Sequence, residues 1–561
     1  MSEIEAKKFF NKALEYYKEK KFNLVEENFE KALELFPDRE SILKNLASIY
    51  FLNGKYKKTE LTIDKFEKLG FKDKELDELK FNVLKKLKKY NELFIFLKDK
   101  NNFKDINKKI YVNSKLLYPF FFKNNEEVES SRAKLEKNID EIYNEDNISL
   151  TLESEMIDPP IFNSSYDQYE NLELNRKIVK TFRKIYPTLN QNFLSEKKNE
   201  KIKIGFISEF FSNHTIGKLF KGLIFNLDQK KFDPIVFHSK KDDHSPIFQE
   251  FVRAEIDSKI KNIILPKGFQ NRVDKIKREN LDIVFFPDIG MSTEFYYLSF
   301  IRFAKVQVTS WGHPITTSNN SIDYFLTSKL LETSDAEKRF SEKLLFSKYL
   351  PMYFYKPVIE NVLEDTDLIV KNKYFCSQNL IKLHPHFDEI LAKIAKKDKS
   401  ASILLIKDND EVISQNLIER FKNNSSLDSD KIKFLDKMDV GKYINLCGNS
   451  SVLLDTIYFG AGNSFHESMF YGTPTVTMPT KNLKSRIVLG AYKQMQIENP
   501  PVVDSIEDYV ECAVELANNE KNKMLNLKKY YQKQASDHLF ENKGFIKDIN
   551  IILENISQMN D

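Results

Sequence analysis

The sequence has few cysteines, no long apolar run and little excess charge, and each absence excludes a class of protein. Its three cysteines among 561 residues stand far apart, without a Cys-x-x-Cys pair. We therefore expect a reducing compartment and no zinc site. No run of about 18 apolar residues occurs, so we expect no transmembrane helix. The first ten residues, MSEIEAKKFF, lack the apolar stretch of a signal peptide, and we expect a cytoplasmic protein.

Positive and negative charges nearly cancel. The chain holds 87 Lys and Arg residues against 83 Asp and Glu residues, a formal net charge of +4. This balance argues against bulk electrostatic binding of nucleic acid, which needs many cations facing the phosphates. The sequence has no P-loop, and we identify no Asp-x-Asp site of the manganese-binding sugar-transferase type. We therefore expect no metal and no other cofactor.

The first 140 residues predict an all-α region of tetratricopeptide-like repeats. Small and aromatic residues fall where a repeat of about 34 residues needs them; they are Phe9, Ala13, Tyr16, Phe29, Ala32 and Pro37. Two repeats are recognisable, and one or two more are degenerate. A plain bundle of helical hairpins is the alternative. Residues 141–200 remain mostly helical by pattern, and we interpret them as a helical linker.

From residue 201 onward, apolar strands alternate with helices, which predicts parallel sheets. In residues 201–355 the predicted strands are KIKIGFIS, DPIVFHS, DIVFFPD, VQVTSW and IDYFLTS. In residues 356–561 they are KYFCS, SILLIKD, KIKFL, VLLDT and TVTMP. We expect an α/β fold of the GT-B kind, with two Rossmann-like halves and a ligand cleft between them. Two unrelated Rossmann domains are the alternative.

Loops that follow parallel strands face the ligand crevice, so polar residues in them are candidates for the site. In the first half these are His214, Asp288 and His313, which we expect to take part in proton transfer or to contact the substrate. Capping of a helix or turn is the alternative role for His214 and Asp288. The loop after His313 is expected to line an acceptor and sugar pocket through Pro314, Thr316 and Thr317.

The second half carries residues suited to an anionic ligand. Lys382 is a flexible cation able to reach a diphosphate, although a surface lysine is the ordinary alternative in so lysine-rich a chain. Gln378 and Asn379, in the same loop, are suited to a base or ribose. The segment 453–479, LLDTIYFGAGNSFHESMFYGTPTVTMP, predicts a strand, a glycine turn and a helix. Such a turn presents backbone N–H groups to a phosphate.

Four stretches in this order resemble the O-GlcNAc transferase and SPINDLY-like protein glycosyltransferases, a group that includes the cytoplasmic bacterial N-glucosyltransferases of adhesins. They are SEFFSNHTIGKLF, the stretch from PDIGMS to YFLTS, SQNLIKLHP, and the segment 453–479 with Ser485-Arg486 beyond it. The resemblance implies a GT-B fold, a UDP-sugar donor, inversion at the anomeric carbon and no metal.

The resemblance also implies roles for individual residues. His214 matches the active-site histidine of the family, and Lys382 matches the lysine that contacts the donor diphosphate. Asn379 matches a donor-binding glutamine, with Gln378 beside it as the alternative. The remaining donor-binding matches are the phosphate loop Gly462, Asn463 and Ser464, the ribose position Glu467, and Arg486. Gly462-Asn463-Ser464 departs from the animal enzymes and is more similar to the bacterial branch. The resemblance therefore does not decide which sugar the donor carries.

The expected function is therefore transfer of a sugar, GlcNAc first of all, from a UDP-sugar to Ser or Thr of a protein. The repeats are expected to help recruit that protein. The alternatives are N-glucosylation of Asn and a polysaccharide or lipid acceptor. A repeat scaffold without catalytic activity is a third alternative. The catalytic base is left open between His214, Asp288 and the donor phosphate.

Overall fold

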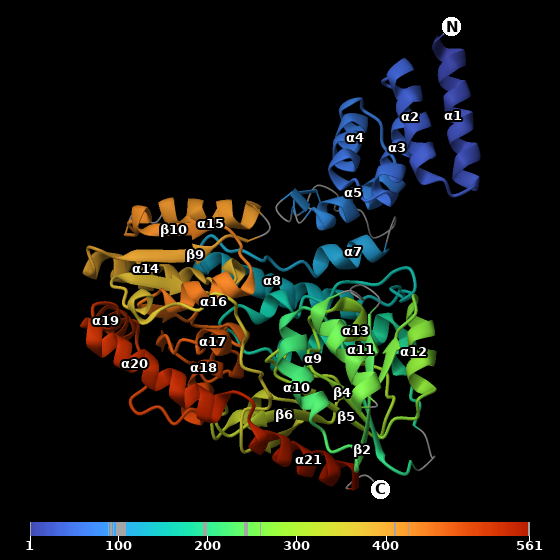
Figure 1. Cartoon of the computed structure of the whole chain (residues 1–561). Coiled ribbons are helices and arrows are strands. Elements are labelled where there is room, and N and C mark those ends of the chain that lie inside the picture. The colour runs from blue at the N-terminus through green and yellow to red at the C-terminus, as the bar shows by residue number, and fades with distance from the viewer. Residues whose placement is uncertain are drawn as a thin grey trace. The chain divides into compact units, whose positions relative to one another are not determined.

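The structure is a computed structural model, and it describes residues 2–87, 89, 92, 93, 95, 96, 108–194, 199–239, 245–258, 260–408, 411–423 and 426–558. The chain forms two compact units, Met1–Leu117 and Tyr118–Asp561. Figure 1 shows the elements of both units, coloured along the chain from blue to red.

The first unit is entirely helical where it is described. Its helices are α1 (Ser2–Lys18), α2 (Phe22–Leu35), α3 (Glu40–Leu52), α4 (Tyr56–Lys68), α5 (Lys74–Lys86) and α7 (Lys108–Lys115). Consecutive helices pack in antiparallel pairs, with Ala13, Val25, Phe29 and Leu46 buried between them.

One buried ion pair recurs along this unit at the repeat period. Lys55 Nζ lies 2.6 Å from Glu26, and Lys89 Nζ lies 2.6 Å from Glu60, with both carboxylates almost fully buried. The two pairs are 34 positions apart in the sequence, which is the length of a tetratricopeptide repeat. The prediction of an all-α N-terminal region is confirmed, and the period of these ion pairs agrees with tetratricopeptide-like repeats. Much of the predicted degenerate repeat lies outside the described residues.

The second unit begins with helices and short turns. They are α8 (Asn125–Asn144), a 3-10 turn (Asn163–Ser165), α9 (Leu172–Ile185) and a second 3-10 turn (Pro187–Asn190). The first unit ends at Leu117, so α8 lies in the second unit, although the sequence interpretation places residues up to 140 with the repeats. The predicted boundaries at residues 200 and 355 stay predictions.

A seven-stranded parallel sheet forms the first half of this unit. Its strands are β1 (Ile202–Ile207), β2 (Phe232–His238), β3 (Lys261–Ile264), β4 (Ile283–Phe286), β5 (Val306–Ser310), β6 (Tyr324–Ser328) and β7 (Lys343–Ser347). Their order is β3-β2-β1-β4-β5-β6-β7, so the direction of winding reverses between β1 and β4. At such a switch point the loops diverge and leave a ligand crevice.

Helices α10 (Thr215–Phe225), α11 (Pro246–Ser258), α12 (Phe269–Lys277) and α13 (Thr293–Leu298) accompany the first sheet. All five strands predicted for this half exist, and β3 and β7 were missed. Both missed strands lie at edges of the sheet and leave side chains exposed. Such strands lack the continuous apolar run that marks a buried parallel strand.

The second half contains a five-stranded parallel sheet in the order β10-β9-β8-β11-β12. The strands are β8 (Lys373–Cys376), β9 (Ser402–Ile406), β10 (Ile432–Leu435), β11 (Val452–Leu454) and β12 (Thr475–Val476). The switch point lies between β8 and β11. The helices are α14 (Pro385–Lys397), α15 (Glu411–Asn423), α16 (Val440–Gly448), α17 (Asn463–Ser468), α18 (Ile487–Gln494) and α19 (Ile506–Ala517). Two such sheets in succession confirm the predicted GT-B-like fold.

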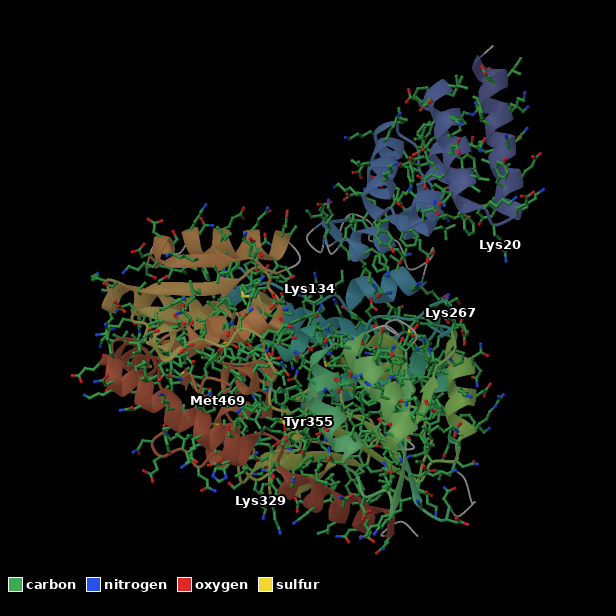
Figure 2. The ribbon with its side chains drawn as sticks, viewed as in Figure 1. Lys20, Lys134, Lys267, Lys329, Tyr355 and Met469 are labelled. Carbon is green, nitrogen blue, oxygen red and sulfur yellow. The ribbon has the colours of Figure 1, made fainter. Side chains whose placement is uncertain are left out.

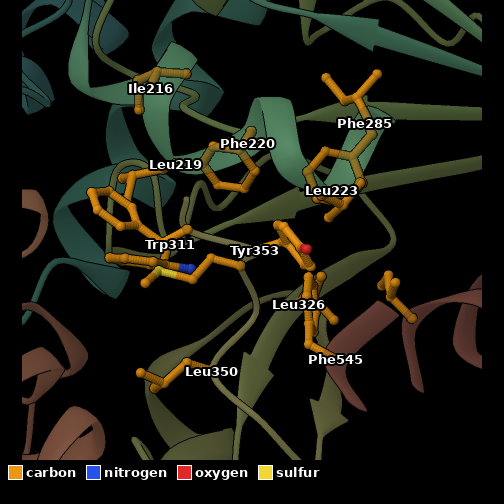
Figure 3. Close-up of a cluster of buried hydrophobic side chains, with 14 of the residues drawn as sticks. Ile216, Leu219, Phe220, Leu223, Phe285, Trp311, Leu326, Leu350, Tyr353 and Phe545 are labelled. Atoms are coloured by element: carbon orange, nitrogen blue, oxygen red, sulfur yellow. The ribbon is translucent and has the colours of Figure 1, made fainter. Parts of the chain in front are cut away.

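The C-terminal helices return to the first half. α20 (Lys521–Gln534) ends in a π turn (Ala535–Leu539), and α21 (Lys543–Gln558) packs against β7. Figure 3 shows Phe545 of α21 near Leu326 and Tyr353 in one apolar core with Leu223 and Phe285. This core joins the last helix to the first sheet and thereby fixes the two halves to each other.

Most of the abundant lysines lie at the surface. Figure 2 labels the exposed side chains of Lys20, Lys134, Lys267 and Lys329, whereas Met469 lies inside the fold. A lysine withdrawn from solvent therefore stands out in this chain. Among the described helices, none combines the length and the apolar character that a membrane crossing requires.

Candidate active site

A cavity of about 340 Å³ lies at the carboxyl ends of the two sheets. Loops after β1, β4 and β5 line one wall, and loops after β8 and β11 line the other. The predicted residues that line it are His214, His313, Pro314, Gln378, Asn379, Lys382, Gly462, Asn463 and Ser464. The switch points of the two sheets thus bring residues separated by up to 250 positions to one place.

His214 both caps α10 and lines the cavity. The Ile216 N–H donates to His214 Nδ1 at 3.2 Å, and the Phe210 ring stacks on the imidazole at 4.4 Å. Because Nδ1 accepts this hydrogen bond, the proton of the neutral ring is assigned to Nε2. Burial, followed by the charge of Lys218, lowers the pKa of His214 to about 4. At neutral pH His214 therefore offers a hydrogen-bond donor rather than a base.

His313 has the opposite tautomer. Its Nδ1 lies 2.8 Å from the Ile289 carbonyl oxygen, which only accepts, so Nδ1 carries the proton and Nε2 the lone pair. That Nε2 is buried and has no hydrogen-bond partner among the described residues. Burial lowers the pKa of His313 to about 4, so the ring is neutral at pH 7. The ring lines the cavity, and the lone pair on Nε2 gives it the chemistry of a base.

Gly290 permits this placement of His313. A Cβ on Gly290 would lie 2.5 Å from His313 Nδ1, and the backbone there has a φ of +106°. Both the close approach and the left-handed conformation favour glycine. The turn after β4 thus brings the Ile289 carbonyl to the imidazole.

Lys382 supplies the positive charge of the opposite wall. Its Nζ donates to Gln378 Oε1 at 2.8 Å and to the Gly460 carbonyl at 3.2 Å, and it lies 4.9 Å from the centre of the Phe459 ring. Burial lowers the pKa of Lys382 to about 8, against the opposing charge of Asp455. The amine is therefore mainly protonated at pH 7. Asn379 accepts from the Ile381 N–H at 3.2 Å and caps the short turn that carries Lys382.

The turn before α17 is shaped by Asp455. This buried carboxylate accepts from the Ala461 N–H and from Thr477 Oγ1, both at 2.7 Å. Burial raises the pKa of Asp455 to about 6. Gln378 Nε2 donates to Ser464 Oγ at 2.8 Å, which connects the turn to the Lys382 loop. Asn463 Oδ1 is a second buried acceptor without a partner among the described residues.

Sequence comparison identifies the group to which this arrangement belongs. A family model described as Glycosyl transferase family 41 matches residues 167–356 and 364–549. The chain belongs to glycosyl transferase family 41. The matched residues span both sheets and every loop that carries Lys382, His214 and His313.

Two relatives share limited identity with this family 41 chain. It is 20% identical over 366 residues to the probable UDP-N-acetylglucosamine--peptide N-acetylglucosaminyltransferase SEC of Arabidopsis thaliana, covering 62% of this chain and 36% of that protein. It is 24% identical over 254 residues to a UDP-glucose:protein N-beta-glucosyltransferase of Actinobacillus pleuropneumoniae, covering 44% of this chain and 40% of that protein. The chain thus spans about two fifths of the length of either relative.

A solved structure agrees with the fold over the whole chain. A mutant O-GlcNAc transferase of Thermobaculum terrenum superimposes with a TM-score of 0.66 at 14% identity, covering 100% of this chain and 98% of that one. Similarity at this identity supports the architecture of repeats followed by two sheets. It assigns no substrate.

Several predicted residues lie away from the cavity lining. Glu467 accepts from Lys218 Nζ at 2.6 Å, an ion pair that joins α17 to α10 across the two halves. Arg486 Nε donates to the Leu331 carbonyl, and its Nη1 donates to the Thr480 carbonyl at 2.9 Å. Neither side chain lines the cavity. The donor-binding roles expected for Glu467 and Arg486 stay predictions.

The threonines after Pro314 are engaged in the protein interior. Thr316 Oγ1 donates to Glu342 at 2.7 Å, and the Thr317 N–H donates to the same buried carboxylate at 2.7 Å. Neither threonine lines the cavity that holds His313 and Lys382. These contacts stabilise the loop that carries His313, whereas the predicted contact with a sugar stays a prediction.

Asp288 lies one residue before the carbonyl that holds His313. Its Oδ2 accepts from Ser208 Oγ at 3.0 Å, and the side chain is buried behind the cavity lining. Burial raises the pKa of Asp288 to about 7, and the neighbouring charge of Glu209 adds to the effect. Asp288 therefore links the ends of β1 and β4, and its catalytic role stays a prediction.

Sequence reasoning missed several lining residues. Lys484 is almost fully buried, and its Nζ donates to the carbonyls of Asp167 at 2.8 Å and Tyr169 at 3.0 Å. Phe162 and Tyr166 line the cavity from the segment interpreted as a helical linker. The signal in the sequence that could have indicated these two lining residues is their spacing of four positions directly after Pro159-Pro160.

Among the described residues, no three His, Cys, Asp or Glu side chains come together as a protein metal site requires. The expectation of transfer without a metal stays a prediction.

Proposed function

We propose that this chain transfers a sugar from a UDP-sugar to a side chain of a protein, with inversion at the anomeric carbon. The observation that carries the proposal is the pairing of Lys382 with His313 around one cavity. One wall offers a cation to a diphosphate, and the other offers a basic nitrogen to an acceptor. Membership of glycosyl transferase family 41 supports the same chemistry.

In the proposed step the acceptor atom forms a bond to the anomeric carbon. The bond from that carbon to the β-phosphate oxygen breaks, and UDP leaves with the electron pair. The acceptor proton passes to a base, for which His313 Nε2 is better suited than the protonated Nε2 of His214. Lys382 stabilises the negative charge that develops on the departing diphosphate, so the step is proposed to need no metal.

The cavity lining suits a ligand rich in hydroxyl groups. His313 Nε2 and Asn463 Oδ1 are buried acceptors that have no partner in the described part of the chain, and such atoms cost free energy until a donor reaches them. Sugar hydroxyls are donors of this kind. We propose GlcNAc as the sugar, in line with the name of the Arabidopsis relative, and Ser or Thr as the acceptor.

Glucosylation of Asn is the second candidate. The Actinobacillus relative, named as a protein N-beta-glucosyltransferase, has the higher identity, 24% against 20%, over a shorter alignment. The turn Gly462-Asn463-Ser464 also resembles the bacterial branch of the family. In either case we propose that the N-terminal repeats help to recruit the acceptor protein.

The test is a transfer assay with purified protein, a mixture of acceptor proteins and either UDP-GlcNAc or UDP-glucose, in the presence of a chelator. We expect UDP release with one of the two donors and a matching mass increase on Ser, Thr or Asn. Lys382→Ala should abolish transfer, whereas Lys329→Ala, at an exposed lysine, should not. If wild-type protein binds neither donor nor UDP, the proposal is wrong. Transfer to a polysaccharide or lipid alone would contradict the protein acceptor.

A further inference from the structure

One part of the cavity wall belongs to neither sheet. The strap, residues 158–171, precedes α9 and contributes Phe162 and Tyr166 to the lining. Both aromatic residues also precede residue 167, where the match to the family model begins. They are therefore features of this chain that the family comparison does not cover.

The two rings span the distance between the walls. Phe162 lies 5.7 Å from the imidazole of His313, and Tyr166 lies 4.7 Å from the ring of Phe459, over which Lys382 Nζ is placed. The rings contact each other edge to face at 5.3 Å. The 3-10 turn at Asn163–Ser165 brings residues four positions apart to the same side. The pair thus extends from the proposed acceptor side to the proposed phosphate side.

Asp167 holds the strap in place from within. Its fully buried carboxylate accepts from Tyr118 Oη at 2.8 Å and from Arg132 Nη1 at 3.0 Å. Lys484 Nζ donates to the Asp167 carbonyl at 2.8 Å, which ties the strap to the second half. Removing one partner of a buried charge network is strongly destabilising.

Further contacts fix the strap on both sides of the aromatic pair Phe162 and Tyr166. On the first half, Thr293 Oγ1 donates to Asp158 at 2.9 Å. On the second half, His384 Nε2 lies 2.9 Å from Gln168 Oε1 and donates to it, because His384 Nδ1 accepts from the His386 N–H. The strap is therefore anchored to both walls, and its aromatic residues have a defined position.

We propose that Phe162 and Tyr166 form the platform on which the sugar ring of the donor packs, and that this platform keeps water from the anomeric carbon. The inference rests on the proposed function. If the diphosphate lies at Lys382 and the acceptor at His313, the sugar occupies the interval that the two rings span. The C–H face of a pyranose is apolar and packs on aromatic rings, while its hydroxyls reach the unpaired acceptors of the walls.

The platform affects the ratio of two reactions of the donor, transfer of the sugar and hydrolysis. In transfer, the acceptor atom bonds to the anomeric carbon, UDP leaves with the electron pair of the broken C–O bond, and the acceptor proton goes to a base. In hydrolysis, water takes the place of the acceptor and yields free sugar, UDP and a proton. Removing an aromatic ring opens space for water beside the anomeric carbon, so hydrolysis gains relative to transfer.

The experiment compares Phe162→Ala and Tyr166→Ala with wild type, using UDP, UDP-GlcNAc and UDP-glucose as ligands in calorimetry. For the donor that wild type binds, we expect a five- to tenfold weaker affinity in either variant, as for the loss of one aromatic contact. UDP affinity should stay within about twofold, because Lys382 is unchanged. The ratio of hydrolysis to transfer should rise several-fold.

Conservative variants and a matched control keep the test decisive if an alanine variant unfolds. Tyr166→Phe keeps the ring and should keep donor affinity, whereas Tyr166→Leu should lose it. Tyr530→Ala, at a partly exposed tyrosine of α20 outside the cavity lining, should change neither affinity nor hydrolysis. Asp167→Asn, which disturbs the anchor, should raise KM for the donor more than it lowers kcat.

Three outcomes are informative. Loss of donor affinity with retained UDP affinity supports the platform. Equal affinities for the donor in wild type, Tyr166→Leu and Phe162→Ala overturn it while leaving the proposed function intact. Failure of wild-type protein to bind UDP or either donor contradicts the proposed function and, with it, the platform.

Discussion

The two walls of the cavity differ in charge and in the state of their hydrogen-bonding atoms. The first sheet contributes two imidazoles that are both neutral at pH 7, one with its proton on Nε2 and one with its lone pair on Nε2. The second sheet contributes a lysine that is mainly charged at pH 7 and a turn with small side chains. We propose that one cavity thereby separates the two tasks of group transfer, which are to accept a proton and to stabilise a leaving anion.

The difference within the first wall is equally instructive. His214 and His313 both follow strands of the same sheet, and by position in the sequence they are equivalent candidates for a base. Their backbone partners differ, since an N–H donates to His214 and a carbonyl accepts from His313. That single difference fixes opposite tautomers and hence opposite abilities at Nε2.

The substitution with the largest expected effect removes the cation of the second wall. Lys382→Ala should lower kcat by about a thousandfold, because a preorganised charge at the leaving group is worth about 3–4 kcal/mol in such sites. Steady-state release of UDP measures it, with Lys329→Ala as the control. A loss below tenfold would contradict the assignment of the leaving-group charge to Lys382.

The substitution with the next largest expected effect removes the basic nitrogen of the first wall. His313→Ala should lower kcat by about a hundredfold, within the usual contribution of a general base, and leave UDP affinity nearly unchanged. The measurement is kcat as a function of pH. Since burial lowers the pKa of His313 to about 4, wild-type kcat should fall as pH drops towards that value. If His214→Asn costs more than His313→Ala, the tautomer argument is wrong.

A smaller effect concerns the pH dependence of UDP binding. The pKa of Lys382 in the free protein is about 8, so below that pH the amine is charged and above it the amine is increasingly neutral. UDP affinity should therefore fall by up to about tenfold per pH unit above 8. In Lys382→Arg the guanidinium stays charged, and the pH dependence should disappear. Calorimetry between pH 7 and pH 10 tests this, and a flat wild-type profile would contradict it.

The smallest effect concerns stability rather than chemistry. His214→Ala removes the cap of α10 and should lower the free energy of unfolding by about 1 kcal/mol. His214→Asn keeps a capping oxygen and should restore most of that loss. Denaturant unfolding of both variants measures the difference. Equal stabilities of the alanine variant and wild type would show that the 3.2 Å contact to the Ile216 N–H contributes little.

Much of the site could be predicted because parallel strands place their following loops at one edge. Local patterns marked the loops of His214, His313 and Lys382, and the alternation of strands and helices indicated two sheets. The same logic located the turn at Gly462–Ser464. These residues depend on local geometry, which a sequence records directly.

The remainder depends on contacts between distant segments. The place of Glu467 in the sequence, one turn into a helix after the glycine turn, predicts ribose binding, yet its carboxylate pairs with Lys218, 249 positions away. Lys484 is one lysine among many in the sequence, and only packing against Asp167 withdraws it from solvent. Phe162 and Tyr166 lie in a stretch whose pattern favoured a helical linker. No local periodicity reports that such a stretch lines a cavity.

The most direct test of the central claim is UDP calorimetry, paired with single-turnover transfer, for wild type, Lys382→Ala and His313→Ala. If the walls divide the work as proposed, Lys382→Ala loses UDP affinity, while His313→Ala binds UDP like wild type and fails to transfer. If both variants lose UDP affinity to the same extent, or if His313→Ala transfers at the wild-type rate, the division of tasks between the two walls is wrong.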